Sequence, residues 1–97
     1  MKQIHLEGQR MLTRDNAHAE LARAFGFPAH YGKNLDALYD VLTDLGETEC
    51  IFEHSEDMVE ALAPYGLKLL QTLIEASIKN PNFKLKIAWE KDEDGEE

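Results

Sequence analysis

The sequence predicts an α/β domain, in which a small three-stranded parallel sheet is packed with helices in the order β-α-α-β-α-α-β. Three short segments have the residue pattern of strands, at residues 2–8, 49–54 and 83–89. Between each strand and the next lie two stretches whose apolar residues recur at helical spacing. Helical connections join parallel neighbours, and 97 residues suffice for one domain. We therefore expect residues 1–89 to form a single domain.

The three predicted strands differ in the spacing of their apolar residues. Ile4 and Leu6 alternate with polar residues in the first strand. The second has a continuous apolar centre, which is typical of a strand covered on both faces and predicts the middle position in the sheet. The third has the alternation of an edge strand. We expect Phe83, Leu85, Ile87 and Trp89 to face inward, and Lys84 and Lys86 to face outward.

The first two helices have start signals in the sequence. Thr13 or Asp15 is placed to cap a helix that runs through Ala24. Asn34 is placed to cap a second helix that ends at about Leu45. The apolar stripe of that second helix, which should dock it on the core, consists of Leu35, Leu38, Leu42 and Leu45.

Two more helices, a short one and then a longer one, are expected between the second and third strands. Ser55 is placed to cap a short helix that ends at Ala63. A longer helix is expected to follow Gly66 and to end at about Lys79. Its predicted apolar stripe includes Leu67, Leu70, Leu73, Ile74 and Ile78.

Charge is distributed unevenly along the chain, which carries a net charge of −9. Residues 34–67 hold nine acids and no lysine or arginine, whereas residues 1–33 and 68–89 are each slightly basic. Residues 90–97 form an acidic tail, which we expect to be disordered. A field of this kind repels phosphate backbones and attracts basic partners, so nucleic-acid binding is not expected.

Composition narrows the class of protein further. No apolar run approaches the ~20 residues that span a bilayer, and the N-terminus lacks the apolar core of a secretory signal. We therefore expect a cytoplasmic protein with no membrane role. The single cysteine, Cys50, agrees with a reducing compartment and is expected to be buried. His5, His18, His30 and His54 have no ligand spacing, so neither a metal nor a cofactor is expected.

The helix that follows Asn34 places two carboxylates side by side. Asp36 and Asp40 lie one turn apart, on the side opposite the leucine stripe. Like charges at this spacing cost a few tenths of a kcal/mol. The helix dipole favours Asp36 in the first turn but gives Asp40 no such compensation, and Tyr39 adds a large ring beside it. This surface gives up some stability, which indicates a use other than folding.

The stretch "YGKNLDALYDVL" resembles the signature of the barstar family of intracellular ribonuclease inhibitors, without a gap over residues 31–43. The order of elements and the length extend the likeness over residues 1–89. The resemblance implies a barstar-like fold and a monomeric, non-catalytic immunity protein. In the family, the second helix and the loop before it occlude the active site of a basic, extracellular-type ribonuclease, and carboxylates take the place of substrate phosphates.

Carried over by position, the resemblance implies a set of partner-binding residues in which Asp40 enters the phosphate site. The full set is His30, Gly32, Asn34, Leu35, Asp36, Tyr39, Asp40, Thr43, Asp44 and Glu75. His30 stands where the best-known member has a tyrosine, and Asp44 and Leu45 stand where the family pattern has a glycine and a tryptophan. Lost aromatic anchors of this kind imply a cognate enzyme different from that of the best-known member.

Two other interpretations remain open from the sequence. The fold is compatible with a binding module for a different basic partner, such as another nuclease toxin or a nucleic-acid-binding protein, since fold does not fix function. An enzyme that uses Asp36 and Asp40 as acid and base is the other, although a convex helix face does not predict the cleft that such chemistry needs.

Overall fold

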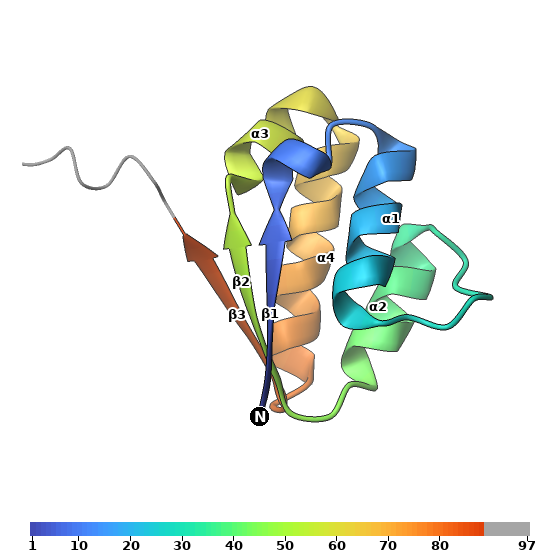
Figure 1. Cartoon of the computed structure of the whole chain (residues 1–97), viewed down its shortest axis with the longest axis vertical. Coiled ribbons are helices and arrows are strands. Elements are labelled where there is room, and N and C mark those ends of the chain that lie inside the picture. Colours follow the sequence, from blue (N-terminus) through green and yellow to red (C-terminus); the bar gives the residue numbers. More distant parts are fainter. Residues whose placement is uncertain (89–97) are drawn as a thin grey trace, which may run out of the picture.

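The computed structural model describes residues 1–88, and three of its segments form one parallel sheet. The strands are β1 (Lys2–Glu7), β2 (Thr48–Glu53) and β3 (Phe83–Ala88), in the spatial order β1-β2-β3 (Figure 1). The predicted α/β class is confirmed, with β2 in the centre and β3 at an edge. The expectations for Trp89 and for a disordered tail at residues 90–97 lie outside the described residues.

Four α-helices and one short 3-10 helix connect the strands. The 3-10 helix η1 (Gly8–Arg10) and the helices α1 (Arg14–Phe25) and α2 (Leu35–Thr43) lie between β1 and β2. Between β2 and β3 lie α3 (Ser55–Ala61) and α4 (Tyr65–Lys79). Thr13 caps α1 by accepting a hydrogen bond from the Asn16 amide, which decides between the two predicted caps.

The helices α1, α2 and α4 form a layer on one side of the sheet (Figure 1). Register places Ile4, Cys50 and Leu85 in one cross-strand row, and Leu6, Phe52 and Ile87 in the next. These rows face the helices, together with Phe83, and the core gathers between the two layers. Cys50 is fully buried, and burial raises the pKa of its thiol to about 12.

The opposite face of the sheet is open, which corrects the prediction that β2 is covered on both sides. Residues along β2 alternate between buried and half-buried or exposed, and Ile51 is half-buried. Its neighbours in the row are the exposed residues His5 and Lys86. The continuous apolar run therefore arises because Ile51 lies on a mixed polar face, and not because a second helical layer covers it.

The start of α3 also differs from the prediction. Ser55 is the first residue of the helix, and His54 is the N-cap residue, with a left-handed backbone (φ 57°) and no side-chain capping bond. The Ser55 hydroxyl is buried and has no hydrogen-bond partner within the described chain. The helix begins one residue early because the His54 carbonyl accepts the Asp57 amide hydrogen bond. It ends at Ala61 rather than Ala63.

The buried face of α4 matches the predicted leucine and isoleucine stripe only in part, because Leu73 is buried and Leu70 packs against the core while the other three members are exposed. The buried residues are Gly66, Leu69, Leu73 and Ala76, whereas Leu67, Ile74 and Ile78 are exposed. Gly66 allows α4 to approach α3 closely, because a Cβ at this position would lie 2.7 Å from the Met58 carbonyl oxygen.

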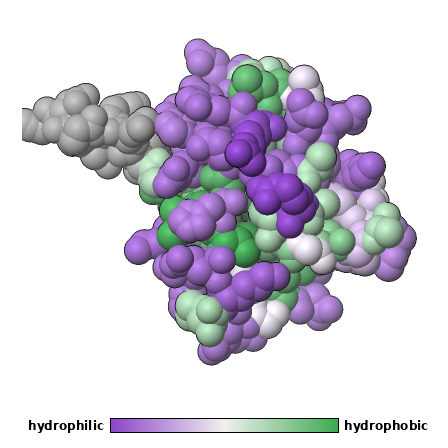
Figure 2. Space-filling view, viewed as in Figure 1, coloured by the Kyte–Doolittle hydropathy of each residue, from purple (hydrophilic) through white to green (hydrophobic). Residues whose placement is uncertain are grey.

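The described surface is largely polar, apart from Leu67, Ile74 and Ile78 on α4 and a few isolated side chains such as Leu12. Hydrophilic residues dominate the face drawn in Figure 2, with a smaller hydrophobic area among them. Within residues 1–88, no helix has both the length and the apolar character needed to cross a bilayer.

Candidate protein interface

Local sequence explains how α2 begins. The Asn34 side chain accepts a hydrogen bond of 2.7 Å from the Ala37 amide, which is the predicted cap. Its amide nitrogen donates to the Gly32 carbonyl oxygen at 3.3 Å. A Cβ on Gly32 would approach the Ala37 Cβ to 3.2 Å, so the loop packs closely against the helix start. Lys33, between them, adopts a left-handed backbone with φ 57°.

Long-range contacts then hold the two ends of α2. The helix packs against α4, and Leu38 and Leu42 are fully buried beneath it. At the C-terminal end, the buried Asn80 side chain donates to the carbonyl oxygens of Leu42 (2.9 Å) and Leu45 (3.1 Å). The Leu42 carbonyl lies in the last turn of α2, where it also accepts the Leu45 amide at 3.3 Å, and Leu45 directly follows the C-cap residue Asp44. Asn80 therefore stabilises the end of α2 from the end of α4.

A buried histidine anchors the loop before α2. His18 of α1 lies 2.7 Å from the Tyr31 hydroxyl through Nδ1 and 2.7 Å from the Tyr65 hydroxyl through Nε2. Burial, and next the charge of Arg14, lower the pKa of His18 below 6.5. The Arg14 guanidinium lies 3.7 Å from the ring centroid of Tyr65. Three segments, α1, the loop and the start of α4, are thus tied together at one imidazole.

Phe27 reinforces this anchor. Its ring stacks on Phe25 at a centroid distance of 5.3 Å and contacts Tyr31 at 4.7 Å. The helix α1 ends at Gly26, which adopts the left-handed conformation that glycine readily takes. The loop leading to α2 is therefore packed against the core by its aromatic residues.

The acidic side chains of α2 point to solvent. Asp36, Asp40 and Asp44 are exposed, and within residues 1–88 none of the three carboxylates takes part in a hydrogen bond or ion pair. Asp36 lies in the first turn, while Asp44 is the C-cap residue. The last turn holds no basic residue, so the helix dipole disfavours the negative charges at that end. The face is a line of uncompensated carboxylates.

A groove of about 570 Å³ runs beside this line of carboxylates. The end of α1 and the following loop form one wall, with Phe27 and Pro28, and the second half of α2 forms the other. Its lining residues are Phe25, Gly26, Phe27, Pro28, Asp40, Val41, Thr43, Asp44 and Leu45. Apolar walls with two carboxylates suit a side chain that has an apolar stem and a cationic head.

The structure brings together most of the residues that the resemblance singled out. Gly32, Asn34, Asp36, Asp40 and Asp44 are exposed along one loop and helix, and His30 is exposed in the middle of that loop. Tyr39 is half-buried against the core edge, as is Leu35.

Two members of the predicted set have less direct placements. The Thr43 hydroxyl donates to the carbonyl oxygens of Tyr39 and Asp40 within its own helix. Glu75 is exposed on α4, and no hydrogen bond or ion pair of residues 1–88 joins it to α2. Glu75 is therefore a separate, outlying member of the set.

Sequence patterns did not identify His18, Tyr65 or Asn80 as supports of this face. A histidine at a position flanked by alanines on a helix gave a weak sign of burial, and Asn80 resembled an ordinary turn residue. Their partners are distant in the sequence, since 38 positions separate Asn80 from Leu42 and 47 separate His18 from Tyr65.

These features define a small two-layer α/β domain that presents one acidic helix, held at both ends, to solvent. The chain matches the family described as Barstar (barnase inhibitor) over residues 1–90. It is also 34% identical over 76 residues to "Putative ribonuclease inhibitor YrdF" of Bacillus subtilis (strain 168), which covers 73% of this chain and 84% of that protein. The chain therefore belongs to the barstar family, as the signature in its second helix predicted.

Proposed function

We propose that this protein is a non-catalytic, stoichiometric inhibitor that occludes the active site of a basic ribonuclease with α2 and the loop before it. Membership of the barstar family and the name of the Bacillus subtilis relative support an inhibitor-like role. The observation that carries the mechanism is the line of exposed, unpaired carboxylates on α2. We further propose that the protein acts as a monomer in the cytoplasm.

The chemistry of a ribonuclease active site favours such a plug. Arginine and lysine side chains that bind RNA phosphates also bind carboxylates through charge-assisted hydrogen bonds. Asp40 occupies the middle of the line, with Asp36 one turn before it and Asp44 one turn after it. A negative helix face meets a positive cleft with complementary potential, which speeds encounter as well as fixing orientation.

The groove beside Asp40 extends this interface. A basic side chain of the enzyme would place its stem against Phe27 and Leu45 and its charge near Asp40 or Asp44. Asp44 adds a carboxylate that the family pattern lacks, while Leu45 leaves the groove open where that pattern has tryptophan. We therefore expect the cognate enzyme to present a long basic residue at this point, and the set of preferred enzymes to differ from that of the best-known member.

Calorimetric titration into a barnase-type ribonuclease, with RNA cleavage followed in parallel, tests this function. We expect saturation at one to one and loss of cleavage. Asp40→Asn should weaken the complex by about 2–5 kcal/mol, the scale for breaking a desolvated charge pair. The matched control is Glu60→Gln, which removes an exposed acid of α3 and should leave the affinity almost unchanged.

The outcomes separate the two binding hypotheses. Equal affinity of Asp40→Asn and the parent would refute the role of Asp40 as the phosphate mimic. Absence of binding to several ribonucleases of this type would favour a different basic partner, to be sought by pull-down on the folded chain. In either case Asp40→Asn should fold as well as the parent or slightly better, because it removes the middle one of three neighbouring negative charges.

A further inference from the structure

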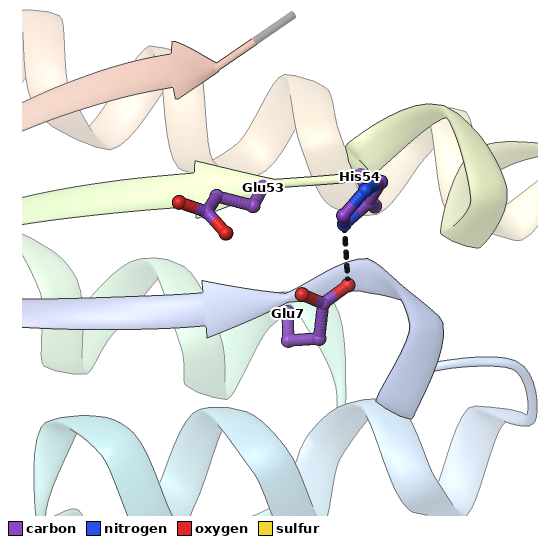
Figure 3. A group of neighbouring side chains, drawn as sticks. All are labelled: Glu7, Glu53 and His54. Atoms are coloured by element: carbon purple, nitrogen blue, oxygen red, sulfur yellow. Dashed lines mark hydrogen bonds and ion pairs between the residues drawn. The ribbon is translucent and has the colours of Figure 1, made fainter. Parts of the chain in front are cut away.

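Two glutamates and a histidine meet at the carboxyl ends of β1 and β2 (Figure 3). Glu7 ends β1, Glu53 ends β2, and His54 follows directly. Glu7 and Glu53 are partners in the strand register, so the parallel pairing itself places the two carboxylates side by side. The sequence offers no sign of this cluster, because 46 positions separate the glutamates and the histidines show no ligand spacing.

The three side chains lie close enough together for one ion to contact all of them. One ligand atom from each, an imidazole nitrogen or a carboxylate oxygen, lies within 4.8 Å of the other two. The His54 Nδ1 atom is already 2.8 Å from Glu7 Oε2. Glu7 and His54 are half-buried and Glu53 is exposed, so solvent reaches the cluster and can supply the remaining ligands of an ion.

Surrounding contacts hold two of these ligands, Glu7 and His54, in place. The backbone amide of Gln9 donates a hydrogen bond of 3.0 Å to Glu7 Oε2, which orients that carboxylate. A Cβ on Gly8 would lie 1.8 Å from the His54 carbonyl oxygen, so the chain after β1 and the chain after β2 are in direct backbone contact. His54 itself is fixed in the left-handed conformation, at φ 57°. The cluster is thus built on two rigid strand ends rather than on a loop.

Electrostatics favour a cation at this point. Like charges directly opposite each other on neighbouring strands are destabilising, and Glu7 and Glu53 are such a pair. A bound divalent ion reverses that repulsion and joins the two strand ends. One imidazole nitrogen with two carboxylate oxygens matches the ligands of Zn²⁺ and similar transition ions, whereas Mg²⁺ and Ca²⁺ favour oxygen alone.

We propose that Glu7, Glu53 and His54 form a binding site for a divalent transition-metal ion of the Zn²⁺ type, with water completing the coordination. The ion binds the imidazole lone pair, and any proton held at that nitrogen passes to solvent. In Figure 1 the ends of β1 and β2 lie next to α3, while α2 lies toward the other end of the helical layer. The ion therefore stabilises the fold without covering the candidate interface.

Titration of Zn²⁺ into the full chain after treatment with a chelator tests the site. We expect one equivalent to bind, with a rise in the unfolding temperature, because an ion that binds the folded state stabilises it. Glu53→Gln and His54→Asn should each weaken binding by more than about tenfold. Asparagine tolerates the left-handed backbone of His54, so that variant should keep its fold. Glu60→Gln, an acid away from the cluster, is the matched control.

The contrary outcomes are equally clear. No binding by the parent, or unchanged affinity in both Glu53→Gln and His54→Asn, would overturn the proposal and place any bound zinc elsewhere, for instance on acids outside the cluster. Equal affinity for Mg²⁺ and Zn²⁺ would refute the role of the imidazole. A shift of the His54 imidazole resonances on adding one equivalent of Zn²⁺ would support direct ligation, independently of stability.

Discussion

Replacement of His18 by leucine tests the anchor of the interface loop. The imidazole is 1% exposed and serves both Tyr31 and Tyr65. Tyr31 is 7% exposed, so loss of its partner leaves a buried hydroxyl unsatisfied, at a cost of about 1–3 kcal/mol. Tyr65 is half-buried and regains water, which limits its loss to about 1 kcal/mol. His18→Leu should therefore lower the free energy of unfolding by about 2–4 kcal/mol at neutral pH.

The same variant should alter the pH dependence of stability. Burial lowers the pKa of His18 from its ordinary value of 6.5, so the unfolded chain binds this proton more readily than the folded chain. The stabilisation from neutral His18 is complete above about pH 6.5 and declines as the pH falls toward the folded-state pKa, by up to about 1.4 kcal/mol per pH unit. His18→Leu removes this contribution.

Urea unfolding of both proteins between about pH 5 and pH 8 measures the effect. The difference in stability between parent and variant isolates His18, because the other histidines are common to both. We expect that difference to shrink as the pH falls below about 6.5. A difference that stayed constant across the range would refute the argument that the folded state holds His18 neutral. A gain in stability at neutral pH would refute the hydrogen-bond argument.

Three further predictions concern the packing of α4, the end of α2 and the rate of association. Leu73→Ala should destabilise the fold by about 2–5 kcal/mol, whereas Ile78→Ala, at a side chain that is 78% exposed, should change stability by less than about 0.5 kcal/mol. Equal losses of stability in thermal unfolding would contradict the buried face assigned to α4. Asn80→Ala should cost about 1–3 kcal/mol, with faster amide exchange at the end of α2, because the carbonyls of Leu42 and Leu45 lose the hydrogen bonds from the Asn80 side chain. Unchanged exchange at the end of α2 would argue against this link. Association with a basic ribonuclease should slow as salt is added, and a rate in stopped-flow mixing that ignores salt would exclude electrostatic steering.

Local signals in the sequence were sufficient to predict the order of helices and strands and the position of the helix that carries the aspartates. Asn34 caps α2 as predicted, because an N-cap depends on residues within one turn. Leu38 and Leu42 are buried as predicted, since the apolar stripe of α2 is unambiguous. The exposure of Asp36 and Asp40 follows from the same periodicity. Their role in binding remains a prediction.

Features that depend on distant partners were not predictable. Apolar periodicity did not report the close approach of α4 to α3 at Gly66, and it assigned Leu67, Ile74 and Ile78 to a face that the fold leaves exposed. The apolar run that contains Ile51 looks the same in a strand covered by helices on one face or on both. The sequence pattern therefore did not reveal that one face of the sheet is open. The contacts of His18 and Asn80 require the fold to be complete before their partners are near.

The short length of α2 limits how the interface can be reproduced outside the protein. The helix has nine residues, fewer than the ~12–15 that an isolated helix needs for appreciable stability in water. Its shape is imposed by Asn34 at one end, by Asn80 at the other and by Leu38 and Leu42 beneath. A linear peptide copying residues 34–45 would have to order itself during binding, and would lose much of its affinity to that entropy. Useful peptide mimics will need a covalent cross-link that stabilises the helix in place of its contacts with α4.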